Sequence, residues 1–292
     1  MQCVPSQRLG TSSDVGLASF PCMVYLHIMK YAALCIALLF AGCWQGLTLP
    51  EADAVALPHA TEFRQGNLVI HNDADVSEKH PLFAELAVFP EQVCRELQLP
   101  ISDKLIHIYL FKDRSSFERY LHREFKDIPS RRALFVKRPV SGLGKSDELQ
   151  ILCFWGDQVQ IDLRHELTHA TLHSLLHDVP LWLDEGLAMY FEPGIAAQGR
   201  NQRALAGIEN SIQDGTWKCD LPRLQGLTEI SQMGLHDYYE VWAWTYYLLN
   251  ATPLQRSATL VYLKERMKPG AAQMPWTISA EELQTHLKTL GL

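Results

Sequence analysis

Residues Arg164–Glu192 read RHELTHATLHSLLHDVPLWLDEGLAMYFE, and the expected organisation of the chain follows from them. The stretch begins with the pattern H-E-x-x-H, formed by His165, Glu166 and His169. Residues four apart lie on the same face of a helix, so both imidazoles can point at one metal ion. Glu166 lies about 100° further round the helix than His165, which suits a base that reaches a water on the metal. The alternative is a structural helix with two buried, hydrogen-bonded histidines.

A second helix is expected to start after Pro180, where Trp182–Ala188 reads WLDEGLA. It places Glu185 sixteen residues after His169, with a turn between the two helices. Two antiparallel helices joined by a short turn can present a histidine pair and a carboxylate to one point. Two histidines, one glutamate and a water form the open tetrahedral site of hydrolytic zinc enzymes.

Four side chains compete to complete the histidine pair: Asp184, Glu185, Glu192 and His173. Successive helical residues point about 100° apart, so only one of Asp184 and Glu185 can face the metal. Glu185 is preferred, because Gly186 beside it should let the two helices approach closely. We expect Asp184 to turn aside and hold a ligand imidazole, His173 to line the pocket, and Glu192 to lie in solvent or behind a ligand.

The combination of HELTH and WLDEGLA resembles the gluzincin metallopeptidases, in particular the peptidase MA-like domains of bacteria. The resemblance is strong over Arg164–Glu192 and weaker over the rest of residues 61–292. It implies that His165, His169 and Glu185 bind Zn²⁺ and that Glu166 is the catalytic base. The implied function is hydrolysis of a peptide or protein substrate, with a protein that binds a partner without turnover as the alternative.

The resemblance also implies a tyrosine, downstream of the glutamate ligand, that donates a hydrogen bond to the oxyanion. Tyr238 is the first candidate for this role and Tyr239 the second. Gluzincin aminopeptidases carry G-x-M-E-N before the zinc motif, where it holds the substrate amine. The nearest stretch here, Gly207–Asn210, lacks the methionine and follows the zinc motif. An endopeptidase is therefore favoured over an aminopeptidase.

Composition excludes several classes of protein. The chain has 292 residues, is 47% hydrophobic and 20% charged, and carries a net charge of −7. These values are typical of a globular protein, and the acidic balance argues against nucleic acid as a partner. After residue 50 only Cys94, Cys153 and Cys219 remain, without a C-x-x-C pair, which predicts neither a disulfide framework nor a cysteine zinc site. The oligomeric state stays open.

The N-terminal residues 1–43 are interpreted as a targeting segment. Met29-Lys30, the apolar run Tyr31–Phe40 and Ala41-Gly42-Cys43 resemble a bacterial lipoprotein signal, with translation starting at Met29. Cys43 would then carry the lipid that anchors an exported protein to the membrane, and residues 44–60 would form a tether. A cleaved signal peptide or a signal anchor is the alternative.

The remaining chain predicts an α+β fold, and the resemblance implies a zincin-like one. We expect a small mixed-sheet lobe over residues 61–157, a mostly helical lobe over residues 158–292, and the zinc cleft between them. Apolar and β-branched runs predict strands at residues 67–72, 105–111, 134–137 and 149–155. Helical spacing predicts helices at residues 81–97, 115–125, 202–213, 238–249, 253–267 and 280–290, besides the two of the metal motif.

Overall fold

The computed structural model describes residues 56–125, 128–140, 147–270 and 278–292. The described residues all belong to one compact unit, Glu51–Leu292. The lipoprotein signal, Cys43 and most of the tether lie outside the described residues. In the part of the chain that is described, no helix is both long and apolar enough to cross a membrane.

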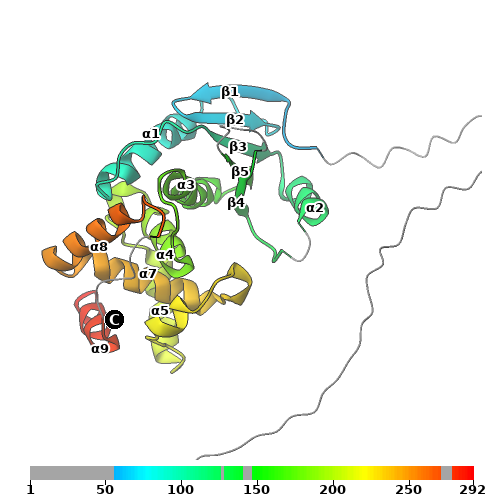
Figure 1. Cartoon of the computed structure of the whole chain (residues 1–292). Coiled ribbons are helices and arrows are strands. Elements are labelled where there is room, and N and C mark those ends of the chain that lie inside the picture. Colours follow the sequence, from blue (N-terminus) through cyan, green and yellow to red (C-terminus); the bar gives the residue numbers. More distant parts are fainter. Residues whose placement is uncertain (1–55, 126–127, 141–146, 271–277) are drawn as a thin grey trace, which may run out of the picture. The chain divides into compact units, whose positions relative to one another are not determined.

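The described residues form an α+β fold, as predicted, with a five-stranded mixed sheet (Figure 1). The strands are β1 (Thr61–Gln65), β2 (Leu68–Asn72), β3 (Ile106–Phe111), β4 (Ala133–Arg138) and β5 (Glu148–Phe154). Their order in the sheet is β1-β2-β3-β5-β4. The three inner strands are parallel, and the two edge strands β1 and β4 run antiparallel to their neighbours.

Helices cover both faces of the sheet (Figure 1). Alternate residues of the inner strands, such as Ile70, Ile108 and Ile151, pack into one core with α1 (Pro81–Glu96) and α3 (Val159–Leu175). The opposite face carries Tyr109, Phe111 and Leu152, which pack on α2 (Arg114–Glu124) in a separate, smaller core. A sheet that is apolar on both faces must be covered on both, which explains the three-layered arrangement.

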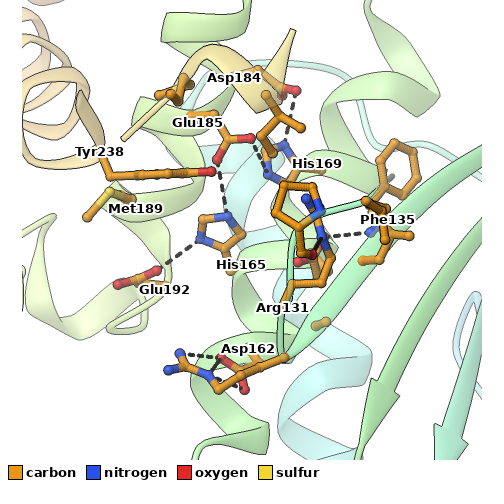
Figure 2. Close-up of a pocket in the computed structure, with 18 of the residues that line it drawn as sticks. Arg131, Phe135, Asp162, His165, His169, Asp184, Glu185, Met189, Glu192 and Tyr238 are labelled. Carbon is orange, nitrogen blue, oxygen red and sulfur yellow. Dashed lines mark hydrogen bonds and ion pairs between the residues drawn. The ribbon is translucent and has the colours of Figure 1, made fainter. Parts of the chain in front are cut away.

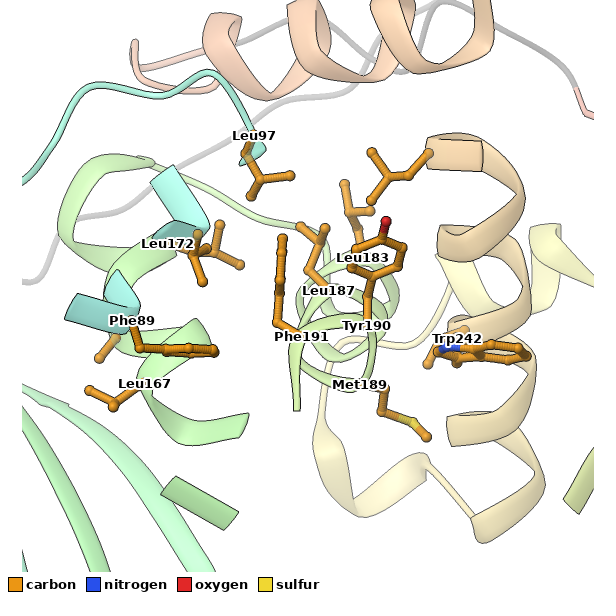
Figure 3. Close-up of a cluster of buried hydrophobic side chains, with 14 of the residues drawn as sticks. Phe89, Leu97, Leu167, Leu172, Leu183, Leu187, Met189, Tyr190, Phe191 and Trp242 are labelled. Carbon is orange, nitrogen blue, oxygen red and sulfur yellow. The ribbon is translucent and has the colours of Figure 1, made fainter. Parts of the chain in front are cut away.

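The second half of the unit is helical. It contains α4 (Leu181–Phe191), α5 (Gln202–Gln213), α6 (Leu221–Gln225), α7 (Leu235–Asn250), α8 (Pro253–Glu265) and α9 (Ala280–Thr289), with 3-10 turns at Ile195–Ala197 and Ile230–Gln232. Figure 3 shows α4 in the middle of this part, with Phe191 and Leu187 on one side and Trp242 of α7 across from Met189. Every residue of α4 from Trp182 to Phe191 is buried. An entirely buried helix has its side chains held on all sides, which fixes where α4 places its carboxylates.

The structure differs from the sequence predictions in two places. The first is β1, which was not predicted because its sequence, TEFRQ, is polar and mostly exposed. It pairs with β2 through the two-residue turn Gly66-Asn67, in which Gly66 has a φ of 61°. The second is residues 214–234, where no helix was predicted but which contain α6 and a 3-10 turn.

Candidate metal centre

α3 supplies both histidines of the motif. It packs between the sheet and α4, so most of its residues are buried whatever their polarity (Figure 1). His169 is almost fully buried, whereas 18% of the His165 side chain is exposed. The two rings lie with their centroids 5.0 Å apart. Their separation of four residues therefore does place both imidazoles on one face.

Glu185 of α4 faces both histidines (Figure 2). Its Oε2 lies 3.4 Å from Nε2 of His165, and its Oε1 lies 3.8 Å from Nε2 of His169. One ligand atom from each of the three residues can be chosen so that all lie within 4.8 Å of one another. The structure thus brings together the three residues that the sequence singled out as metal ligands.

Asp184 turns toward the other nitrogen of His169. Its Oδ2 lies 3.1 Å from Nδ1 of His169 and 2.9 Å from Nε2 of His173. Adjacent residues of α4 therefore hold opposite sides of the same imidazole. A carboxylate at the far nitrogen fixes the orientation and tautomer of a metal-binding histidine. His169, His173 and Asp184 form a second group that could hold a cation, so this set overlaps the first at His169.

Glu192 contacts Nδ1 of His165, just as Asp184 contacts Nδ1 of His169. Its Oε2 lies 2.9 Å from Nδ1 of His165, and Nδ2 of Asn201 donates a 2.7 Å hydrogen bond to its Oε1. Glu192 is buried, which excludes the solvated position that the sequence left open. Asn201 was not predicted, because it precedes α5 and reaches Glu192 only through the fold.

The electrostatics of the centre favour a bound cation. Burial alone would lower the pKa of His169, but the carboxylates of Asp184 and Glu185 outweigh it and raise that pKa to about 9. Against the same effect of burial, the neighbouring carboxylates of Glu185 and Glu192 raise the pKa of His165 well above its usual value. Burial would raise the pKa of Asp184, yet His169 and His173 hold it well below its usual range.

The buried Oε2 of Glu185 has no hydrogen-bond partner in the described structure. A buried carboxylate oxygen without a partner is costly, and a cation would compensate it. Two imidazoles and a carboxylate are the donor set that suits Zn²⁺. The residues present therefore fit a zinc ion.

Glu166 lies beside the histidines and is held by the edge strand β4. The backbone N–H of Phe135 donates a 2.7 Å hydrogen bond to its Oε2, while the Phe135 ring packs at 6.3 Å from the ring of His169. Burial raises the pKa of Glu166, and the neighbouring His165 and His169 oppose that rise. The contact joins residues 31 positions apart, so the H-E-x-x-H motif gave no sign of it.

The two candidate tyrosines point in different directions. Tyr238 lines the cleft and reaches from α7 toward Glu185 and His165 (Figure 2). Burial, followed by the charge of Glu185, raises the pKa of Tyr238 above its usual value, so its hydroxyl keeps the proton that a hydrogen-bond donor needs. Tyr239 packs on α5, where its ring occupies the space that a Cβ on Gly207 would fill.

The expected role of Gly186 was wrong. A Cβ at this position would lie 2.1 Å from Oγ1 of Thr245 and 2.6 Å from the carbonyl oxygen of Val241, both in α7. Gly186 therefore allows α4 to approach α7, not α3. The physical reason is the helical rotation of about 100° per residue, which turns Gly186 away from the face that carries Glu185.

The candidate metal centre lies at the bottom of a cleft of about 660 Å³. One wall is the segment before and within β4, and the other is the start of α7 with the turn before it. The residues that line it are Ile128–Phe135, Asp162, His165, Glu166, His169, Asp184, Glu185, Met189, Glu192, Arg203, Ile230, Ser231, Met233, Leu235 and Tyr238. A cleft of this volume holds a ligand of several residues' size.

Comparison with known proteins gives one result. Residues 161–269 match a family described as "Protein of unknown function (DUF1570)". The match spans the histidines, Glu185 and Tyr238, but not β4 or the segment before it. No curated protein and no solved structure matches the chain.

Proposed function

We propose that the chain is a zinc-dependent metallopeptidase with a zincin-like fold, and that it acts as an endopeptidase of the gluzincin type. The observation that carries the proposal is the convergence of His165, His169 and Glu185, with the carboxylate of Glu166 in the same cleft and close enough to interact with both histidines. Three protein ligands leave a fourth position on zinc for water or substrate, which is the arrangement of hydrolytic sites. The open cleft above the centre gives a peptide access to it.

In this proposal His165, His169 and Glu185 hold the metal, while Asp184 and Glu192 orient the two imidazoles. When bound, zinc supplies a Lewis acid for the scissile carbonyl and lowers the pKa of a water to about 7. Side chains of the protein carry out the proton transfers and donate the hydrogen bond to the oxyanion.

Glu166 acts as the general base and then as the general acid. Its Oε2 accepts the N–H of Phe135, so Oε1 is left to take the proton from the attacking water. As the water oxygen bonds to the carbonyl carbon, the Tyr238 hydroxyl donates a hydrogen bond to the developing oxyanion. Glu166 then passes its proton to the amine, and the C–N bond breaks.

The proposal is tested with purified protein loaded with Zn²⁺ and a mixture of unlabelled peptides, analysed by mass spectrometry. We expect new internal cleavage products, their loss after chelation, and their return when zinc is added back. Glu166→Gln is the control that excludes a contaminating peptidase, because it removes only the base. A metal-loaded protein that cleaves no peptide would contradict the proposal and favour a binding role.

We also propose that the protein is exported and anchored by a lipid on Cys43, on the strength of the sequence Met29–Cys43. The intact mass of protein extracted from membranes tests this proposal. A mature N-terminus at another residue, or an unmodified Cys43, would contradict it.

A further inference from the structure

The charged side chains that line the cleft differ in whether they have a partner of opposite charge in the structure. The acidic ones have partners in the structure: Asp162 accepts hydrogen bonds from Arg132, the shortest at 2.7 Å, and Glu166 accepts the N–H of Phe135. Asp184 and Glu192 contact the histidines. Among the described residues that line the cleft, only Glu185 is therefore an acidic side chain that could take a basic group from a substrate.

Arg131 is the exception among the positive charges of the β4 wall. It is half-buried, and its Nε donates a 3.3 Å hydrogen bond to the carbonyl oxygen of Pro129. Within the described residues it forms no ion pair, whereas its neighbour Arg132 is bound by Asp162 through both carboxylate oxygens. A guanidinium carries five N–H donors, so most donors of Arg131 are left for a ligand.

Arg131 lies close enough to the centre to act on it electrostatically. It stands four residues before Phe135, the residue that holds the base, and on the opposite side of the cleft from Tyr238 (Figure 2). The charge of Arg131 lowers the pKa of Tyr238, against the larger effects of burial and Glu185. The positive charge of Arg131 therefore acts on the same cleft that Phe135 and Tyr238 line.

We propose that Arg131 is a specificity-determining residue that binds a carboxylate of the substrate near the scissile bond. The proposal rests on the proposed peptidase function. The planar guanidinium matches a carboxylate with two parallel hydrogen bonds, which a neutral amide cannot form. The carboxylate belongs either to an aspartate or glutamate side chain, as for an endopeptidase, or to the C-terminus of the peptide, in which case the enzyme would act as a carboxypeptidase.

Binding of three matched peptides tests the proposal and separates the two sources. One peptide contains glutamine and ends in an amide, the second replaces the glutamine by glutamate, and the third keeps the glutamine but ends in a free acid. Affinities are measured on the zinc-loaded Glu166→Gln protein, so that no peptide is consumed. We expect one of the acidic peptides to bind about 10-fold more tightly than the neutral peptide, as for a partly exposed hydrogen bond between charged groups.

Arg131→Gln in the same background should abolish this preference, so that the acidic and neutral peptides bind with equal affinity. Arg119→Gln is the matched control, because Arg119 is an exposed arginine on α2 that does not line the cleft. It removes the same charge and should keep the preference. Equal affinities for the three peptides, or a preference that survives Arg131→Gln, would overturn the assignment.

Cleavage by the otherwise unchanged protein distinguishes the two proposals. If peptides are cleaved but kcat/KM is the same for acidic and neutral ones, the peptidase function stands and the role of Arg131 is wrong. If no peptide is cleaved but the binding preference exists and depends on Arg131, the peptidase function is wrong and the carboxylate site remains. In Arg131→Gln the ratio of kcat/KM for the acidic peptide to that for the neutral peptide should fall to about one, whereas loss of a group that stabilises the oxyanion would lower kcat/KM for both peptides alike.

Discussion

The bottom and the walls of the cleft are built differently. At the bottom, α3 and α4 place His169, Asp184 and Glu185 in a buried, interlocked set of contacts. The walls consist of the segment around Arg131 and Phe135 and of the start of α7 with Tyr238, all half-exposed. The bottom is therefore rigid and suited to holding a metal, whereas the walls are free to contact a substrate. Substitutions at the bottom should remove the metal or weaken its binding, and those in the walls should change turnover or selectivity while the metal stays.

The largest effect is expected for Glu185→Ala at the bottom. It removes one of the three proposed ligands, so zinc and activity should be lost together. Metal analysis of the purified variant, with circular dichroism to show that it is folded, measures this. His173→Ala is the control, because His173 contacts Asp184 but not Glu185, and it should keep both zinc and activity. Stoichiometric zinc at unchanged affinity in Glu185→Ala would remove Glu185 from the ligand set.

Glu166→Gln tests the role of Glu166 as general base independently of metal binding. The amide keeps the size of the side chain and its oxygen can still accept the N–H of Phe135, but it cannot take a proton. Activity should fall by about 10²–10⁴, the usual contribution of acid–base catalysis. Zinc content should match that of the unchanged protein. Near-full turnover would show that Glu166 is not the base.

Tyr238→Phe tests the α7 wall. It removes the hydroxyl proposed to stabilise the oxyanion, so kcat should fall by about 10²–10³ with zinc retained. Tyr239→Phe is matched in chemistry and adjacent in sequence, but its ring packs on Gly207 away from the cleft. It should leave kcat unchanged. Equal effects of the two substitutions would mean that the tyrosines act through the stability of α7.

Asp184→Ala should have the smallest effect of the four. It removes the carboxylate 3.1 Å from Nδ1 of His169 but leaves all three ligands in place. Loss of such an orienting partner typically weakens metal binding by about 10–100-fold. Competition with a chelator of known affinity measures the change. Unchanged affinity would show that burial alone orients His169.

The bottom of the cleft was largely predictable from the sequence, because its geometry is local. Helical periodicity places His165 and His169 on one face of α3, and rotation along α4 separates Asp184 from Glu185. The expected position of Asp184 behind a ligand imidazole agrees with its contact to His169. These relations involve neighbours on one helix or on two consecutive helices.

The walls and their supports were not predictable, because they depend on contacts between distant residues. The N–H of Phe135 reaches Glu166 across 31 residues, and nothing in the sequence around Arg131 suggested a place in the cleft. Gly186 was assigned to the wrong helix pair, because sequence spacing alone does not show which neighbour a helix face meets. The missed strand β1 left one signal, the turn pair Gly66-Asn67, which is typical of two-residue hairpins.

The hydrogen bond from Phe135 to Glu166 predicts the order in which the protein loses activity and bound metal on warming. β4 is an edge strand with β5 as its one neighbour in the sheet, whereas α3 and α4 lie in the interior. Segments with fewer buried contacts open at lower free energy than the core. When β4 detaches, Glu166 loses its donor while His165, His169 and Glu185 keep their helices. Inactivation should therefore be reversible at first and precede the release of zinc.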